Sequence, residues 1–219
     1  MESFEINSVN EPENEGAKEK VSPKGSSFLL YLHDIVYLLA AIVVLLLVFF
    51  RIVVVSGSSM KATLVDGDYL LLVSNVLYRD PKQGDIVVIS KDSFDNGAPI
   101  IKRVIATEGQ VVDIDFSRGI VYVGDSIDSL RPLDEPYLFT ATTTQEGIQF
   151  PLTVKNGCIF VMGDNREGSK DSRDPVIGQI ENREVLGKVI FLLLPGTDKG
   201  SQSPDYSRIG RRYGLCYLS

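Results

Sequence analysis

The chain contains a serine and a lysine whose surroundings suit them to act together as nucleophile and base. Ser59 ends the small polar run Ser56-Gly57-Ser58-Ser59, and Lys102 lies inside the apolar run 100–105. A serine hydroxyl is a poor nucleophile unless a base removes its proton. Burial lowers the pKa of a lysine, so a buried amine can be that base. The ordinary alternatives are a flexible hinge at 56–59 and an edge-strand lysine that discourages aggregation.

The sole histidine narrows the chemistry further. His33 lies beside Asp34 at the start of a long apolar segment, away from both candidate residues. Ser-His-Asp and Cys-His sites need an imidazole in the catalytic domain, and HExxH-type zinc sites need two. Nucleophilic chemistry in this chain must therefore use another base, and no metal site is expected.

A third polar segment, at 163–174, follows the apolar run 158–162. It is dense in Asp, Asn, Ser and Arg. Such a density of hydrogen-bonding side chains suits a rigid active-site loop, although a surface loop would also be polar. The mixture of Asp and Arg predicts internal ion pairs that hold the loop.

The elements that position these residues are predicted to be strands. Beyond Ser56, short apolar clusters rich in Ile, Val, Phe and Tyr alternate with Gly, Pro and Asp, which is typical of an all-β domain. The predicted strands are 69–73, 85–89, 100–105, 111–114, 120–123, 158–162 and 188–194. The polar stretch 140–146 is expected to be a loop or a hairpin insertion.

An apolar segment before this domain predicts one transmembrane helix over 27–55. Residues 35–50 carry no charge, and the run resumes after Arg51, so it approaches the roughly 20 residues that span hydrocarbon. A cleaved secretory signal fits poorly, because the run exceeds the usual ~7 to 15 residues, no A-x-A-like site follows and an acidic tail precedes it. The segment is interpreted as an uncleaved anchor. Apolar residues near 53–55 and Met60 are expected at the bilayer surface.

The tails and the charge balance complete the description. Six glutamates fall within the first 19 residues, so 1–26 is predicted to be a disordered tail. Residues 196–219 are predicted to be a loose tail whose arginines, Arg208, Arg211 and Arg212, are solvated or rest near lipid headgroups. The net charge is -7 with no basic block, which argues against a nucleic-acid partner. Cys158 is expected to be a buried thiol, and its pairing with Cys216 stays open.

Taken together, the polar segments resemble the sequence boxes of the type I signal peptidase family, membrane-bound serine proteases with a Ser/Lys dyad. The S-M-x-P-T box matches 59–63 except that Ala62 replaces proline, and the K-R-V box matches 102–104. The G-D-N-R-x-x-S-x-D-S-R box matches 163–173 at every fixed position, and 84–88 resembles the G-D-I-V box. The long third box and the shared order make the combination very specific.

The resemblance implies a role for each matched residue. Ser59 would be the nucleophile and Lys102 the general base. Ser169 would hydrogen-bond and orient the lysine, while Asp171 and Arg173 would support the site through ion pairs. The backbone N–H of Ser59 would donate to the oxyanion. Some members add a serine hydroxyl at the position of Gly57, so the second donor stays open here. No cofactor is needed.

The resemblance also implies a substrate and a location. Exported preproteins would be cut after small residues at A-x-A-type sites. Residues 56–195 would form an extracytoplasmic β catalytic domain at the plasma membrane, with the N-terminus in the cytoplasm; the positive-inside bias that the sequence itself offers is slight. Which preproteins are cut, whether the enzyme is a housekeeping or specialised one, and the oligomeric state stay open.

Two other functions compete with this interpretation. One is a catalytically inactive, membrane-tethered β domain that serves as a binding module, for which Ala62 leaves a small opening. The other is the related class of self-cleaving repressors, which would need a DNA-binding helix-turn-helix and no membrane helix. Neither condition of the second class is met.

Overall fold

The computed structural model describes residues 24–61, 63–198, 201 and 203–213. The predicted acidic tail falls mostly outside these ranges, as does Cys216. The chain divides into two compact units, 1–42 and 43–219.

Helix α1 (Lys24–Phe49) begins in the first unit and ends within the second. Its stretch Phe28–Phe49 is long and apolar enough to cross a membrane and is the one such helix among the described residues. The helix stops six residues before the predicted end of the span at 55, because residues Phe50–Val54 form strand β1 instead. Strand β1 pairs with β2 in antiparallel register, from Phe50 opposite Val73 to Val54 opposite Tyr69. The β-branched run 52–55 favours this extended conformation.

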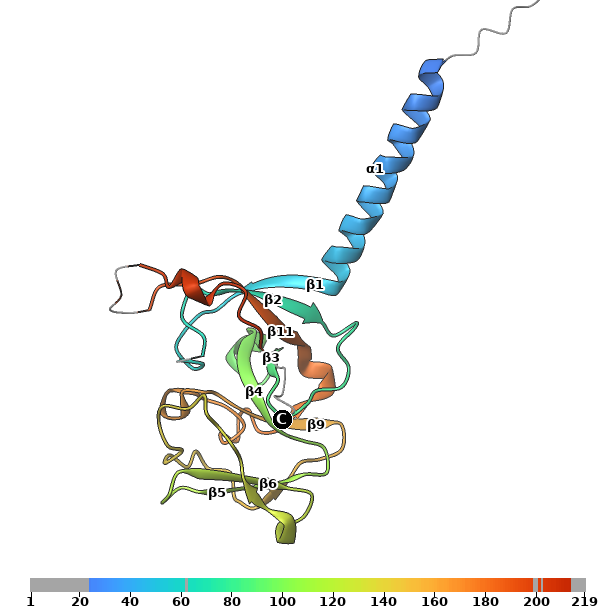
Figure 1. Cartoon of the computed structure of the whole chain (residues 1–219). Helices are drawn as coiled ribbons and strands as arrows, with labels where there is room; N and C mark the ends of the chain where they lie inside the picture. The colour runs from blue at the N-terminus through green and yellow to red at the C-terminus, as the bar shows by residue number, and fades with distance from the viewer. Residues whose placement is uncertain (1–23, 62, 199–200, 202, 214–219) are drawn as a thin grey trace, which may run out of the picture. The chain divides into compact units, whose positions relative to one another are not determined.

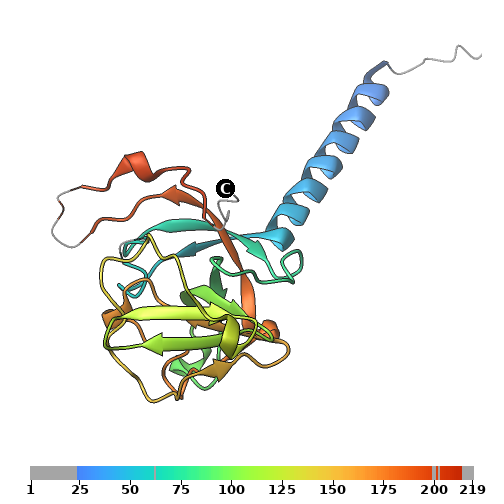
Figure 2. The ribbon, with the colours of Figure 1, turned by 60° about the horizontal axis from the view of Figure 1, so that its bottom comes forward.

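The second unit consists of two antiparallel sheets. In the described part of the chain, seven strands form one sheet in the order β1-β2-β11-β3-β4-β9-β10, and four form the other in the order β7-β6-β5-β8 (Figures 1 and 2). The remaining bounds are β2 (Tyr69–Ser74), β3 (Ile86–Ile89), β4 (Ile100–Thr107), β5 (Val111–Asp115), β6 (Ile120–Gly124), β7 (Arg131–Pro132), β8 (Leu152–Thr153), β9 (Cys158–Met162), β10 (Ile180–Glu181) and β11 (Val185–Leu194). The mainly β class and all seven predicted strands are confirmed.

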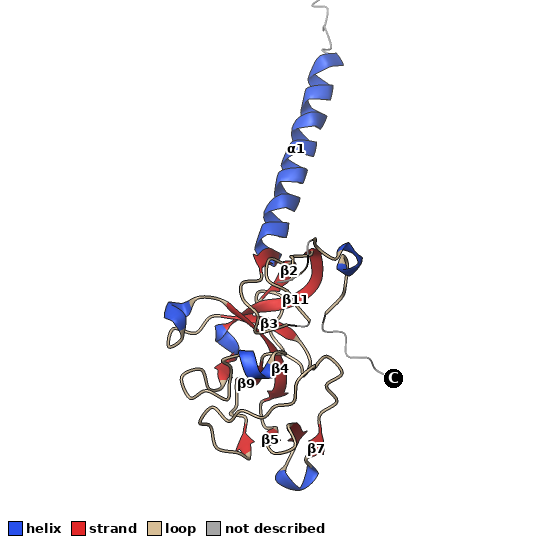
Figure 3. Cartoon of the chain, turned by 90° about the vertical axis from the view of Figure 1, so that its left-hand side faces the viewer, coloured by secondary structure: helices blue, strands red, loops and turns tan. Residues whose placement is uncertain are grey.

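Loops and short 3-10 turns connect these strands (Figure 3). The turns are Asp95–Gly97, Ile127–Ser129, Arg166–Gly168, Asn182–Glu184 and Tyr206–Arg208. The stretch 140–146 lies in the long connection between β7 and β8 and forms no strand, as expected of a loop. The segment 163–174 follows β9, so the polar box begins where a buried strand ends.

Strand β4 occupies an interior position between β3 and β9. Lys102 pairs in register with Val87 of β3, and Arg103 pairs with Met162 of β9. Only 3% of the Lys102 surface is exposed. The alternative of an edge-strand lysine is therefore wrong, and the fold buries this amine in the middle of a sheet.

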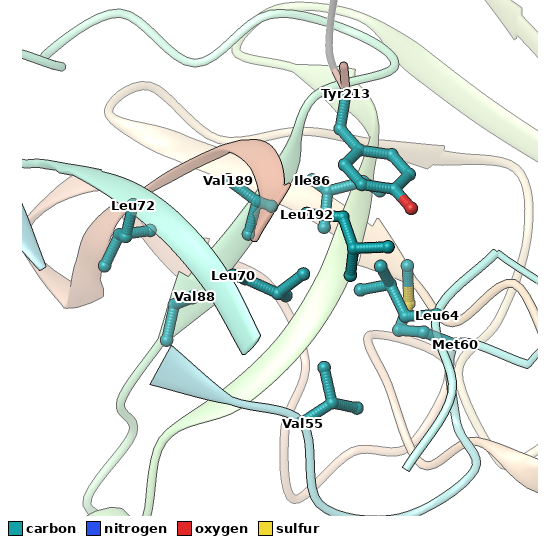
Figure 4. Close-up of a cluster of buried hydrophobic side chains, with 10 residues drawn as sticks. All are labelled: Val55, Met60, Leu64, Leu70, Leu72, Ile86, Val88, Val189, Leu192 and Tyr213. Carbon is teal, nitrogen blue, oxygen red and sulfur yellow. The ribbon is translucent and has the colours of Figure 1, made fainter. Parts of the chain in front are cut away.

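The core next to the segment that bears Ser59 is a cluster of buried apolar side chains. Figure 4 shows it, and its members are Val55, Met60, Leu64, Leu70, Leu72, Ile86, Val88, Val189, Leu192 and Tyr213. Val55 and Met60 were expected at the bilayer surface, but they are 5% and 2% exposed. They instead attach the two ends of the 56–59 segment to the sheet.

The C-terminal segment is packed, in contrast to the predicted loose tail. Arg208 is buried and forms an ion pair with Asp68 through two hydrogen bonds, of 2.6 and 3.0 Å. Tyr213 belongs to the core, and Gly210 N–H donates to the Leu192 carbonyl at 2.8 Å. The prediction that Arg208 is solvated is wrong, because its partner lies 140 residues away and no local pattern reveals it.

Replacing Arg208 with methionine is expected to lower the free energy of unfolding by about 3 kcal/mol, since the Asp68 carboxylate would stay buried without its counterion. Denaturant unfolding of the detergent-solubilised protein measures the change. The matched control is Arg211→Met, three residues away and exposed, which should change stability by less than about 0.5 kcal/mol. Equal losses in both variants would contradict the role of the buried pair.

Candidate active site

Ser59 and Lys102 meet through a direct side-chain hydrogen bond. Lys102 Nζ donates to Ser59 Oγ at 2.9 Å and to the Ile101 carbonyl at 3.0 Å. The two residues come from distant parts of the chain, the loop after β1 and the middle of β4. A hydroxyl and an amine at this distance can exchange a proton once the amine is neutral.

Burial favours the neutral form of the Lys102 amine. Desolvation lowers the pKa of its ammonium group to about 8, although the carboxylates of Asp171, Asp164 and Glu146 oppose the change. The direction follows from the cost of placing a charge where water cannot reach it. A substantial fraction of the amine is therefore unprotonated in mildly alkaline solution, as a general base requires.

The third box holds the backbone of the Ser59 segment. Asn165 donates from its backbone N–H to the Ser59 carbonyl at 2.9 Å and from its side-chain amide to the Ser58 carbonyl at 3.0 Å. A Cβ added to Gly163 would lie 2.5 Å from the Ser59 carbonyl oxygen, so this close approach requires glycine. The segment around Ser59 is thus fixed in place, which rules out the alternative of a free hinge.

Asp164 joins three of the four boxes. Its carboxylate accepts from Arg103 Nε at 2.8 Å, from a second Arg103 nitrogen at 2.6 Å and from the Thr63 hydroxyl. Arg103 also donates to the Gly84 carbonyl at 2.9 Å and lies over the Tyr137 ring. Both members of the ion pair are largely shielded from water. Thr63, four positions after Ser59, and Arg103, directly after Lys102, are therefore tied to a single carboxylate.

Asp171 and Arg173 form the internal ion pair that the sequence predicted. Arg173 Nε donates to Asp171 at 2.8 Å, and both side chains are fully buried. Asp171 also accepts from the Gly163 N–H at 3.0 Å, while Arg173 donates to the Arg166 carbonyl at 2.7 Å. The pair thus ties the end of the box to its beginning, directly behind the residues that hold Ser59.

The loop 133–151, which connects β7 with β8, is held against the 163–173 box by the arginines of that box. Arg166 forms an ion pair with Glu135 and donates to the Thr142 hydroxyl at 2.7 Å. Arg173 donates to the Thr144 carbonyl at 3.2 Å, and the Glu146 carboxylate lies 3.7 Å from the Arg173 guanidinium. The arginines of the box therefore organise a loop that sequence reasoning treated only as an insertion.

Ser169 does not take part in the hydrogen bond between Ser59 and Lys102. It is 4% exposed, and its side chain packs against Gly163. Its hydroxyl donates to the Lys170 carbonyl at 3.5 Å, and among the described residues it makes no hydrogen bond to Lys102. An orienting contact from Ser169 to the amine would require a change of its side-chain rotamer.

The backbone N–H of Ser59 is available to donate a hydrogen bond. Within the described ranges, the N–H of Ser59 has no hydrogen-bond acceptor. The N–H of Gly57 is occupied, because it donates to the Asp66 carboxylate at 2.7 Å. Gly57 adopts a φ of 93°, a conformation that favours glycine over residues with a side chain.

Sequence reasoning brought together Ser59, Lys102, Asp171 and Arg173, but it assigned no role to Asp164, Asn165 or Arg103. The fixed positions of the third box were the available signal for the first two, yet their partners are more than 60 residues away. Cys158 is free and buried, as expected. In the part of the chain that the structure covers, no three His, Cys, Asp or Glu side chains are grouped so as to hold a metal ion.

Comparison with known proteins places this geometry in a family. The family model described as signal peptidase, peptidase S26, matches residues 29–194. A signal peptidase I from Bacillus licheniformis is 30% identical over 186 residues, covering 81% of this chain and 95% of that protein. A probable signal peptidase I-1 from Synechocystis is 35% identical over 157 residues, covering 67% of this chain and 72% of that protein.

A solved structure is also similar. A signal peptidase I from Enterococcus faecalis is 28% identical, with a TM-score of 0.39 over 50% of this chain and 96% of that one. The family match and the Bacillus relative both include the segments that carry Ser59, Lys102 and the third box. This chain, with its apolar N-terminal helix and its mainly β domain, therefore belongs to the signal peptidase family, peptidase S26.

Proposed function

We propose that this membrane-anchored signal peptidase cleaves signal peptides from preproteins with Ser59 as nucleophile and Lys102 as general base. The observation that carries the proposal is the 2.9 Å hydrogen bond between Lys102 Nζ and Ser59 Oγ, made by an amine that is 3% exposed. Membership of the signal peptidase family indicates the reaction, and Ser59 and Lys102 are the groups that would perform it.

The steps follow from the roles of the two side chains. Neutral Lys102 takes the proton of Ser59 Oγ as the oxygen attacks the scissile carbonyl, and the unoccupied Ser59 N–H donates to the oxyanion. The ammonium of Lys102 then returns a proton to the departing amine, which leaves an acyl ester on Ser59. Attack of water on that ester, with Lys102 again as base, releases the signal peptide and restores the pair.

The three supporting residues of the third box have secondary roles in the proposal. Asp171 accepts from Arg173 and from the Gly163 N–H, and Asn165, two residues after Gly163, donates to the Ser59 carbonyl. Ser169 packs against Gly163, and its proposed role is to orient the amine of Lys102, as the family resemblance implies. All three act as positioning residues, since none contacts Ser59 Oγ or Lys102 Nζ through a hydrogen bond in the described structure.

The proposed substrate preference is the one that the family resemblance implies, a cut after an A-x-A-type site. The half-buried Val53 and Ile101 pack against the core cluster that contains Met60, the residue after the nucleophile. We expect the small side chains before the cut to lie against these apolar residues. In this proposal α1 spans the plasma membrane with its N-terminus in the cytoplasm, and the β domain meets bilayer-bound preproteins on the outer side.

Purified protein in detergent should cleave a preprotein that carries an A-x-A site, and Ser59→Ala should abolish this cleavage. Because only neutral Lys102 accepts a proton, kcat/KM should rise with pH through about 8 and level off above it. The measurement is kcat/KM from about pH 6 to about pH 10. An inert wild type would favour the binding module instead, whereas cleavage that persists in Ser59→Ala would show that Ser59 is not the nucleophile.

A further inference from the structure

A pocket adjoins the nucleophile on the side of the 57–66 turn. Its volume is about 300 Å³, and it is lined by Gly57, Ser58, Lys61, Leu64, Val65, Asp66 and Asp198. Three of these residues lie within two positions of Ser59 in the sequence, so the pocket borders the segment that carries Ser59. The pocket is separate from the supporting network of the third box, none of whose residues lines it.

The charges in this pocket distinguish it from the apolar surface near the pair. Lys61 Nζ lies 3.0 Å from Asp198, and both side chains are about half exposed. Asp66 accepts from the Gly57 N–H at 2.7 Å and contributes a second carboxylate. With two carboxylates against one ammonium, the pocket carries a net charge of about -1, which attracts cations and repels anions.

We propose that this pocket binds a basic side chain from the start of the mature protein, directly after the scissile bond. The inference rests on the proposed function. In that function, the residues before the cut are small and apolar and use the apolar surface by Val53 and Ile101. A charged pocket beside Ser59 is therefore left for the residues after the cut. Lys61 and Asp198 then set the preference of the enzyme for the mature sequence, and Asp66 adds the charge that makes the preference basic.

Each acidic residue has a variant that removes its charge while keeping its shape. Asp66→Asn retains an oxygen that can accept from Gly57 N–H, so the turn that carries Ser59 keeps its hydrogen bond. Asp198→Asn releases Lys61 from its ion pair. The double variant leaves Lys61 as the one charged side chain among the described lining residues, so the net charge of the pocket changes from negative to positive.

The test compares two preproteins that are identical except for two lysines or two glutamates directly after the cut. The wild type is expected to show a kcat/KM ratio of about five in favour of lysine, as partly exposed charge pairs allow, and the ratio should shrink at high salt. The double variant Asp66→Asn with Asp198→Asn should invert the preference toward glutamate. Measuring a ratio within each variant cancels any general change in the activity of the Ser59–Lys102 pair.

The control is Asp125→Asn, an exposed residue at the end of the β5–β6 hairpin that does not line the pocket. It changes the net charge of the protein by the same amount as each single variant, and its ratio should stay at the wild-type value. A wild-type ratio near one, or a ratio that the double variant leaves unchanged, would overturn the pocket inference while Ser59-dependent cleavage stands. An absence of cleavage of both preproteins would overturn the proposed function itself.

Discussion

Replacing Lys102 with methionine is expected to lower kcat/KM by about 10³-fold or more at every pH. Methionine matches the length of lysine but has no group that can take the proton of Ser59 Oγ. The loss should not reflect unfolding, because the side chain is 3% exposed and an apolar replacement removes a desolvated amine from the sheet. The measurement is preprotein cleavage together with the unfolding midpoint of the same sample.

Two further lysine variants make this result specific. Lys102→Arg keeps a cation that does not deprotonate in proteins, so it should be as inactive as Lys102→Met and should not recover at high pH. Lys155→Met removes an exposed lysine, and this variant should cut at the wild-type rate. A Lys102→Met enzyme that cuts nearly as well as wild type would show that another group activates Ser59.

The pH profile links this variant to the burial of the amine. Desolvation is the largest influence on the pKa of Lys102 and lowers it to about 8, while three nearby carboxylates act in the opposite direction. An exposed lysine would become neutral only near pH 10.4 and would leave the enzyme almost inactive at neutral pH. In the proposed mechanism the interior position of β4 contributes to the chemistry, because burial lowers the pKa of the amine that would act as base.

The sequence was sufficient to predict the strands and the reacting pair. The predicted strands were short apolar clusters bounded by Gly, Pro and Asp, and such local signals depend little on distant parts of the chain. Lys102 stood out because lysine is rare within an apolar run. The absence of a second histidine narrowed the choice of base. The boxes then placed Ser59 with Lys102 before any distance was known.

The hydrogen bonds and ion pairs that support Ser59 and Lys102 were not predictable, because they depend on which distant segments meet in the fold. Asn165 contacts the Ser58 carbonyl across 107 positions, and Arg208 contacts Asp68 across 140. The end of α1 was misplaced for a related reason. The run 52–55 is as apolar as the helix before it, and only its pairing with β2 makes it a strand. Composition describes a segment, whereas pairing depends on its neighbours in the fold.

Several polar groups of the site act as one unit because they share buried carboxylates. Asp164 holds Thr63 and Arg103, and Asp171 holds Gly163 and Arg173. These groups are buried without metal ligation among the described residues and are satisfied by one another. Such networks are rigid when complete and costly when a member is lost. The largest loss of stability is expected when Asp164 is replaced.

Replacing Asp164 with asparagine is expected to lower the free energy of unfolding by about 3 to 5 kcal/mol and to reduce cleavage with it. The Arg103 guanidinium would stay largely buried without a counterion, and one of its N–H groups would face the new amide N–H. The turn after Ser59 would also lose a strong acceptor for the Thr63 hydroxyl. Denaturant unfolding and preprotein cleavage on the same sample measure both effects.

An exposed ion pair provides the matched control. Arg183 lies 2.6 Å from Glu181, but its side chain is 80% exposed, so Arg183→Gln should change stability by less than about 0.5 kcal/mol. Adding Arg103→Met to Asp164→Asn should recover part of the lost stability, because the uncompensated buried charge is then removed. Strictly additive losses in the double variant would mean that the two side chains stabilise the site independently and that Asp164 does not join the boxes through Arg103.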